Sequence, residues 1–159
     1  MGKEDERRPD LDGTGLSIGL VAARYNRPIV EAMLESALNA LNKSGATPEP
    51  VIWVPGSFEL PAAAQALASS GRVDAIVCLG CVIKGETAHF EHVAGAAASG
   101  IMEVALRTGV PCTFGVLTTY DEEQARVRVD KGREAAETAI EMSRLLRKVR
   151  RAGRARPAN

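Results

Sequence analysis

The chain has 159 residues, of which 45% are apolar and 25% charged, and its 20 Lys and Arg residues balance its 20 Asp and Glu residues. This length suits one domain, and the zero net charge excludes a surface built throughout to hold nucleic acid or an anionic membrane. No apolar run approaches the roughly 18–20 residues of a membrane span, and the charged N-terminus lacks the apolar stretch of a signal peptide. We therefore expect a soluble cytoplasmic protein. The number of cysteines is odd, so we expect no disulfide framework.

Apolar runs and helix-stop residues predict strands and helices that alternate along the chain. In chain order we expect a strand at 16–22, a helix from Pro28 to Gly45, a strand at 51–54, a helix at 60–69, a strand at 75–79, a helix at 89–107 ended by Gly109, a strand at 110–117, and a last helical stretch from Asp121 past Leu146 with a break near 130–132. Near-continuous apolar strands that alternate with helices are typical of a parallel sheet covered on both faces. We therefore predict an α/β protein with a flavodoxin-like three-layer α/β/α fold, in which helices cover both faces of a four-stranded parallel sheet.

The expected domain covers residues 16–150, between a flexible N-terminal tail at 1–15 and a basic, flexible C-terminal tail at 151–159. Beyond Glu141 every charged side chain is basic. Such a run can contact nucleic acid or a phosphate surface, but more often it is solvated, and we favour the solvated alternative.

Ligands of doubly wound sheets bind beyond the carboxyl ends of the strands. In this chain those ends are followed by loops at 23–27, 55–59, 80–89 and 118–121. No Gly-x-Gly-x-x-Gly follows the first strand and no Walker-type Gly-Lys-Ser/Thr occurs, so the standard dinucleotide and triphosphate loops are disfavoured. A flavodoxin-like redox or signalling domain would need an FMN loop or an acidic phosphorylation site there, and Ala22-Ala-Arg24 offers neither.

Two patterns raise the possibility of redox or metal chemistry, and both are disfavoured. Cys78 and Cys81 form a C-x-x-C, but Cys78 lies in an apolar strand, where an offset of three points the two thiols to opposite faces. His89 and His92 share a helix face, but a zinc site needs further ligands, so we expect no metal. We expect His92 to be solvated or hydrogen-bonded.

The turn from Gly85 to Thr87 precedes a predicted helix, where free backbone N–H groups and the helix dipole favour an anion. His89 follows two residues after Thr87. A histidine so close to an anion-binding turn indicates phosphate binding combined with proton transfer. The alternative is a simple capped helix start.

Tyr25 and Phe58 are unusual because the chain has only one Trp, two Tyr and three Phe residues. Both lie in loops at the expected ligand end of the sheet, and Glu59 follows Phe58. Together these residues are typical of a surface that stacks on a flat polar ring and accepts a hydrogen bond from it. The alternative is that each ring packs on a helix as a cap.

Four ordered sequence blocks resemble those of the 6,7-dimethyl-8-ribityllumazine synthase family, transferases of riboflavin biosynthesis. The resemblance covers about Leu16 to Val149 and rests on Ala23-Arg-Tyr-Asn26, Val54-Pro-Gly-Ser-Phe-Glu-Leu-Pro61, Gly80-Cys-Val-Ile-Lys-Gly-Glu-Thr-Ala-His-Phe-Glu-His92, and Phe114-Gly-Val-Leu-Thr-Thr119 with Glu123-Gln124.

The resemblance implies that 5-amino-6-(D-ribitylamino)uracil and 3,4-dihydroxy-2-butanone 4-phosphate condense to 6,7-dimethyl-8-ribityllumazine. Phosphate and water are released, and the reaction needs no cofactor and no metal. The alternative is an assembly-forming relative that binds a flavin or lumazine with little or no turnover. The presence of His89, Glu59 and the Gly85–Thr87 turn argues against that alternative.

The resemblance also implies roles for single positions. His89 transfers protons, and Tyr25 stacks on the pyrimidine. The pyrimidine and its ribityl chain are further bound by Ser57, Phe58, Glu59, Cys81, Val82, Ile83 and, from a neighbouring subunit, Phe114. The phosphate is bound by Gly85, Glu86, Thr87 and a neighbour's Arg128, and Asn26 and Lys131 are additional candidates. Arg126 competes with Arg128 because the stretch from Arg128 to Gly132 is shorter than is usual in the family.

The same resemblance implies small-molecule substrates and a homo-oligomer, either a pentamer or an icosahedral assembly of pentamers, with active sites shared between adjacent subunits. Riboflavin synthase is a candidate partner, and we expect no nucleic-acid or membrane partner. The shortened stretch at 128–132 lies near assembly contacts in the family, so the choice between pentamer, decamer and shell stays open.

Overall fold

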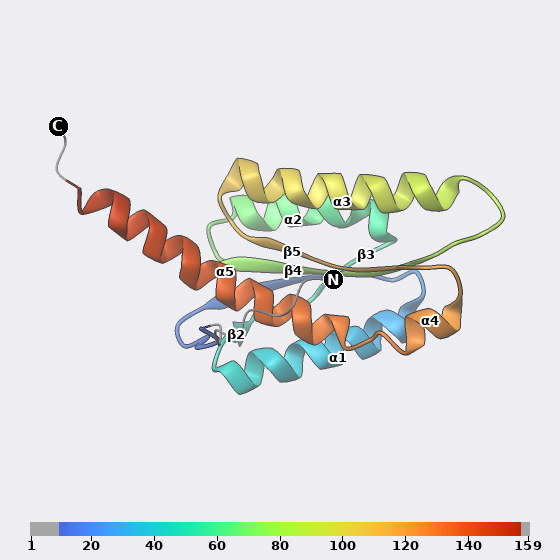
Figure 1. Ribbon diagram of the computed structural model, residues 1–159, viewed down its shortest axis with the longest axis horizontal. Coiled ribbons are helices and arrows are strands. Elements are labelled where there is room, and N and C mark those ends of the chain that lie inside the picture. Colours follow the sequence, from blue (N-terminus) through green and yellow to red (C-terminus); the bar gives the residue numbers. More distant parts are fainter. Residues whose placement is uncertain (1–9, 157–159) are drawn as a thin grey trace, which may run out of the picture.

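The computed structural model describes residues 10–156, which form a parallel sheet between two layers of helices (Figure 1). In chain order the elements are β1 (Ser17–Ala23), α1 (Arg27–Ser44), β2 (Thr47–Pro48), β3 (Ile52–Val54), the 3₁₀ turn η1 (Ser57–Glu59), α2 (Leu60–Ser69), β4 (Ala75–Ile83), α3 (His89–Thr108), β5 (Cys112–Thr119), α4 (Glu122–Arg126) and α5 (Lys131–Arg154). Helices α2 and α3 cover one face of the sheet, and α1 and α5 cover the other. The predicted three-layer α/β/α fold is confirmed.

The strands follow the order β2-β1-β4-β5, and all of their pairings are parallel. The short strand β3 also pairs with β1. Since β4 occupies the other edge of β1, β2 and β3 share one strand position, interrupted at 49–51. Pro48 ends β2 and Pro50 lies within the interruption, and neither can donate to the ladder, which is tolerated at a sheet edge. The sheet is therefore four strand positions wide, as predicted, but contains a fifth strand, β2, that we did not predict.

Strands β1 and β4 are buried on both faces, which explains their near-continuous apolar sequence. Ile18 and Leu20 pack in the core beneath α1 and α5, whereas Val21 packs in the core beneath α2 and α3. Cys81 lies in the first of these cores and Cys78 in the second. The predicted separation of the two thiols to opposite faces of the sheet is confirmed.

The predicted helix stops are also confirmed. Gly45 and Gly109 follow α1 and α3 in the left-handed conformation, with φ values of 83° and 72°, which a glycine adopts without strain. Within residues 10–156, no helix combines the length and the apolar character needed to cross a bilayer.

The structure describes residues 10–15 and 151–156 of the two expected tails. Arg144 of α5 donates from Nε to the carbonyl of Asp12 (2.8 Å) and from Nη2 to that of Thr14 (2.6 Å), so residues 12–15 are held against the domain. At the other end α5 continues to Arg154, past the expected start of a tail at 151, and extends beyond the sheet (Figure 1). The rest of the two expected tails, residues 1–9 and 157–159, lies outside the described residues.

Gly132 permits the close contact between α5 and α1. A Cβ at this position would overlap the backbone carbonyl of Met33. Gly132→Ala should therefore force the helices apart and lower the free energy of unfolding by about 3 kcal/mol, measured by urea titration. Gly153→Ala on the same helix is the control, because no atom lies within 4 Å of the added Cβ. Equal stability of the two variants would contradict this account of the packing.

Candidate active site

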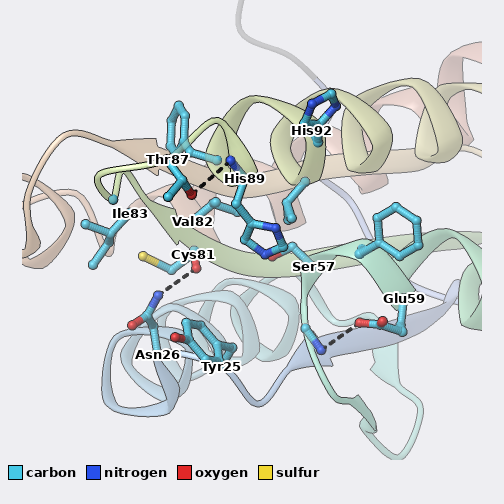
Figure 2. A pocket seen from close by; sticks show the side chains of 15 residues that line it. Tyr25, Asn26, Ser57, Glu59, Cys81, Val82, Ile83, Thr87, His89 and His92 are labelled. Carbon is cyan, nitrogen blue, oxygen red and sulfur yellow. Dashed lines mark hydrogen bonds between the residues drawn. The ribbon is translucent and has the colours of Figure 1, made fainter.

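A cavity of about 600 Å³ opens at the carboxyl ends of β1 and β4 (Figure 2). The chain leaves β1 for β2 and β3 on one side and builds β4 and β5 on the other, so the strand order reverses between β1 and β4. Ligands of open parallel sheets bind at such a topological switch point. The cavity is lined by Tyr25, Asn26, Gly56, Ser57, Phe58, Glu59, Cys81, Val82, Ile83, Gly85, Thr87, His89, Phe90, His92 and Val93.

Most of the residues singled out in the sequence line this cavity, and they come from three of the four loops expected at the ligand end. The residues that do not line it are Glu86, Phe114, Arg128 and Lys131. Sequence reasoning missed four lining residues: Gly56, Phe90, His92 and Val93. His92 is exposed, as expected, but it borders the cavity, three residues after His89 on the same helix. That helical spacing was the signal that could have placed it there.

Two aromatic side chains are exposed where the cavity meets solvent. Tyr25 is 73% exposed and Phe58 60% exposed, although large apolar rings are usually buried. The backbone N–H of Tyr25 donates to the carbonyl of Pro55 at 3.1 Å and joins the loop after β1 to the loop after β3. The two rings therefore belong to loops that are fixed to each other, and their exposure makes them available to a ligand.

The loop that carries Phe58 is held in place by local contacts. The carboxylate Oε2 of Glu59 accepts a hydrogen bond from the N–H of Gly56 at 3.0 Å and closes the turn η1. Ser57 is buried against Gly80 of β4, where an added Cβ would overlap the Ser57 hydroxyl. The absence of a side chain at Gly80 thus lets this loop lie directly on the sheet beside the cavity.

Helix α3 begins at His89, at the border of the cavity. The hydroxyl of Thr87 accepts a hydrogen bond from the backbone N–H of His89 at 3.4 Å (Figure 2). Lys84 Nζ lies 3.4 Å from Glu91 Oε1, and the pKa of Glu91 is lowered by a hydrogen bond from its own backbone N–H and by Lys84. Because a helix N-terminus offers free N–H groups and a positive dipole end, this is the part of the cavity that best accommodates an anion.

No lysine or arginine is among the described residues that line the cavity. Arg126 forms an ion pair with Glu122, which raises the pKa of the guanidinium group. Arg128 donates instead from Nη1 to the backbone carbonyl of Gln124 at 2.8 Å. Lys131 Nζ lies 3.2 Å from a carboxylate oxygen of Glu134. The described residues of one chain therefore give the cavity neither the lysine nor the arginine that usually binds a phosphate.

The cysteines are protonated in this environment. Burial raises the pKa of Cys81 to about 11, with a smaller contribution from Glu122, and burial raises the pKa of Cys112 to about 11. Burial also raises the pKa of Cys78 far above its usual value. A redox-active pair needs a thiol with a lowered pKa, so this C-x-x-C lacks that property. In the described part of the chain, no three His, Cys, Asp or Glu side chains form a group that could hold a metal ion.

Comparison with known proteins identifies relatives of the whole domain. The family model described as 6,7-dimethyl-8-ribityllumazine synthase matches residues 15–147. A 6,7-dimethyl-8-ribityllumazine synthase from Thermus thermophilus is 48% identical over 150 residues, which cover 90% of this chain and 96% of the relative. Proteins of the same name from Paraburkholderia phymatum and Paraburkholderia phytofirmans are 47% and 45% identical over 141 residues, which cover 87% of this chain and 82% and 84% of the relatives.

The raised pKa of Cys81 predicts slow, pH-dependent alkylation. In the Cys78→Ala variant, in which Cys81 is the only thiol of its tryptic peptide, iodoacetamide at pH 8 should label the native protein on the order of 10²-fold more slowly than the unfolded chain. The rate should rise about tenfold per pH unit, because the thiolate fraction does. Mass spectrometry of the peptide follows the labelling. Rapid, pH-independent labelling near pH 7 would indicate an activated thiol and contradict the assignment.

Proposed function

Since the chain belongs to the 6,7-dimethyl-8-ribityllumazine synthase family, we propose that it is the transferase that condenses 5-amino-6-(D-ribitylamino)uracil with 3,4-dihydroxy-2-butanone 4-phosphate. The product is 6,7-dimethyl-8-ribityllumazine, formed in the penultimate step of riboflavin biosynthesis. The observation that carries the proposal is one cavity that combines exposed rings, a helix N-terminus and a histidine. A relative that binds without turnover is not favoured, because Glu59, Thr87 and His89 all line this cavity.

The pyrimidine substrate fits the end of the cavity between β1 and β4. Tyr25 offers an exposed ring for stacking on the pyrimidine, which is worth on the order of 1 kcal/mol beyond the area buried. The strand end at Cys81–Ile83 offers backbone groups to the edge of the ring. The loop Ser57–Glu59 offers a hydroxyl and a carboxylate for the ribityl chain.

The phosphate substrate fits the turn before α3. The N–H groups of the Gly85–Thr87 turn and the dipole of α3 stabilise its negative charge, and the Thr87 hydroxyl is a further donor. His89 lies between this turn and the pyrimidine end (Figure 2). From there it can transfer protons while the aromatic amine condenses with the ketone, phosphate leaves, and the second nitrogen closes the ring with loss of water. Holding both substrates side by side supplies much of the acceleration.

We further propose a homo-oligomer in which adjacent subunits share each site. A bound phosphate is usually held by a lysine or an arginine, and neither type lines the cavity within the described residues of one chain. Arg128 lies outside that cavity, and three large apolar side chains of α3 and β5 are exposed: Met102, Leu106 and Phe114. A head-to-tail ring covers such side chains and brings Phe114 and Arg128 of one subunit to the cavity of the next. We propose that this ring is a pentamer, alone or within an icosahedral assembly.

The proposed function predicts a specific loss in His89→Ala. With both substrates present, the unaltered protein should form fluorescent lumazine and release phosphate. His89→Ala should lower kcat by up to about 10²-fold and change both KM values much less, because a proton-transfer group acts in the transition state. His92→Ala should retain a kcat near that of the unaltered protein. No product from the unaltered protein would refute the function, and a normal kcat in His89→Ala at every pH would remove this residue from the mechanism.

The shared site predicts complementation between two inactive variants. His89→Ala and Arg128→Ala should each be impaired at every site when assembled alone. After unfolding, equal mixing and reassembly, random head-to-tail rings place an intact cavity beside an intact arginine at about a quarter of the sites. Activity should then rise well above that of either parent. If mass measurements show mixed rings but activity stays at the average of the parents, both groups act within one chain.

A further inference from the structure

Asn26 has an unusual backbone conformation at the end of β1. Its φ of 57° and ψ of 41° place it in the left-handed region. Among the described residues 10–156, every other residue with a positive φ is a glycine. Asparagine tolerates this region better than most residues do. Asn26 also occupies the N-cap of α1, where an asparagine side chain usually accepts a hydrogen bond from the helix, but here it makes no such bond.

The side chain of Asn26 is directed to the sheet instead. Its Nδ2 donates a hydrogen bond to the backbone carbonyl of Cys81 at 2.9 Å, across the floor of the cavity (Figure 2). This bond joins the loop after β1 to the last residues of β4. The usual capping interaction of an N-cap asparagine is thus replaced by a contact inside the candidate active site.

The carbonyl of Cys81 depends on this contact because β1 diverges from β4. The ladder between the two strands extends from the pair Ile18–Ala75 to the pair Ala22–Leu79. Beyond that point β1 bonds to the other side, where the N–H of Arg24 donates to the carbonyl of Val54 at 2.8 Å. Strand β4 continues to Ile83 with this edge uncovered.

Successive residues of a parallel strand direct their backbone groups alternately to its two neighbours. Ile76 and Lys84 donate to the carbonyls of Pro111 and Thr119, on the side of β5. The groups of Cys81 and Ile83 therefore point to the opposite side, into the gap left by β1. The Asn26 side chain donates to the carbonyl of Cys81. The N–H and C=O of Ile83 remain directed at the cavity.

We propose that Asn26 is a positioning residue that takes the place of the missing β1–β4 ladder pair. By holding the Cys81 carbonyl it fixes the peptide planes up to Ile83, whose N–H and C=O then form a donor–acceptor pair for a planar ring with adjacent C=O and N–H groups. The uracil ring of the pyrimidine substrate has such an edge, and in this respect the inference rests on the proposed function. Asn26 itself need not touch the substrate to set its affinity.

Two variants separate the amide from the backbone conformation. Asn26→Gly adopts a φ of 57° without strain but removes the donor. Asn26→Asp keeps the shape and the tolerance of the left-handed region but turns a carboxylate oxygen toward the Cys81 carbonyl. The matched control is Ser143→Ala, which removes a buried hydroxyl that donates to the carbonyl of Ala139 at 2.8 Å and lies 3.4 Å from the carbonyl of Asp74, just before the other end of β4.

Both Asn26 variants should raise the KM for the pyrimidine about tenfold, while the KM for the phosphate substrate and kcat change less than about threefold. Ser143→Ala should leave both KM values near those of the unaltered protein. An unchanged pyrimidine KM in Asn26→Gly, or an equal rise of both KM values, would overturn the positioning role and leave the proposed function intact.

Backbone hydrogen exchange tests the inference independently of turnover. The amides of Val82 and Lys84 should exchange about tenfold faster in Asn26→Gly than in the unaltered protein or in Ser143→Ala, because the strand end is no longer held. If the unaltered protein forms no lumazine, the proposed function fails, and this measurement alone decides the role of Asn26. Equal exchange in all three proteins would then overturn it.

Discussion

The divergence of β1 from β4 after the pair Ala22–Leu79 is the constraint on which the candidate site depends. Up to that pair the two strands satisfy each other's backbone groups, and no side chain or ligand can enter between them. Beyond it, β1 bonds toward β3 while β4 continues to Ile83, so polar backbone is left exposed inside an otherwise apolar sheet. Buried backbone groups require partners. The Asn26 amide supplies one for Cys81, and the substrate supplies the next in the arrangement that we propose.

Two glycines let segments of the chain pack closely next to a cavity of about 600 Å³. Gly132 lets α5 lie against α1, and Gly80 lets the Ser57 loop lie on β4. With 4% aromatic residues, the core is built from aliphatic side chains, and Tyr25 and Phe58 stand exposed at the cavity. The packing of the domain and the chemistry of the site thus draw on different residue types.

The distribution of charge is the reason for our proposal that adjacent subunits share each site. The turn before α3 supplies N–H groups and a helix dipole but no charged donor. Arg126, which competes with Arg128 as the candidate phosphate ligand, is already paired with Glu122. In the arrangement that we propose, the described residues of one chain bring no lysine or arginine to the leaving phosphate. An oligomer that adds a neighbour's Arg128 would couple assembly to activity, since the cavity would reach full electrostatic complementarity only when the ring is closed.

The order of strands and helices, the stops at Gly45 and Gly109 and the loops that line the cavity were determined by the sequence itself, because periodicity, chain reversals and strand ends are local properties. The tertiary structure decided what depends on pairing between distant segments. It split the edge strand into β2 and β3, held residues 12–15 through Arg144, and directed the Asn26 side chain to a carbonyl 55 residues away. The contacts of Arg144 and Asn26 do not follow from local pattern, because they are set by where α5 crosses the sheet and by where β1 stops pairing with β4.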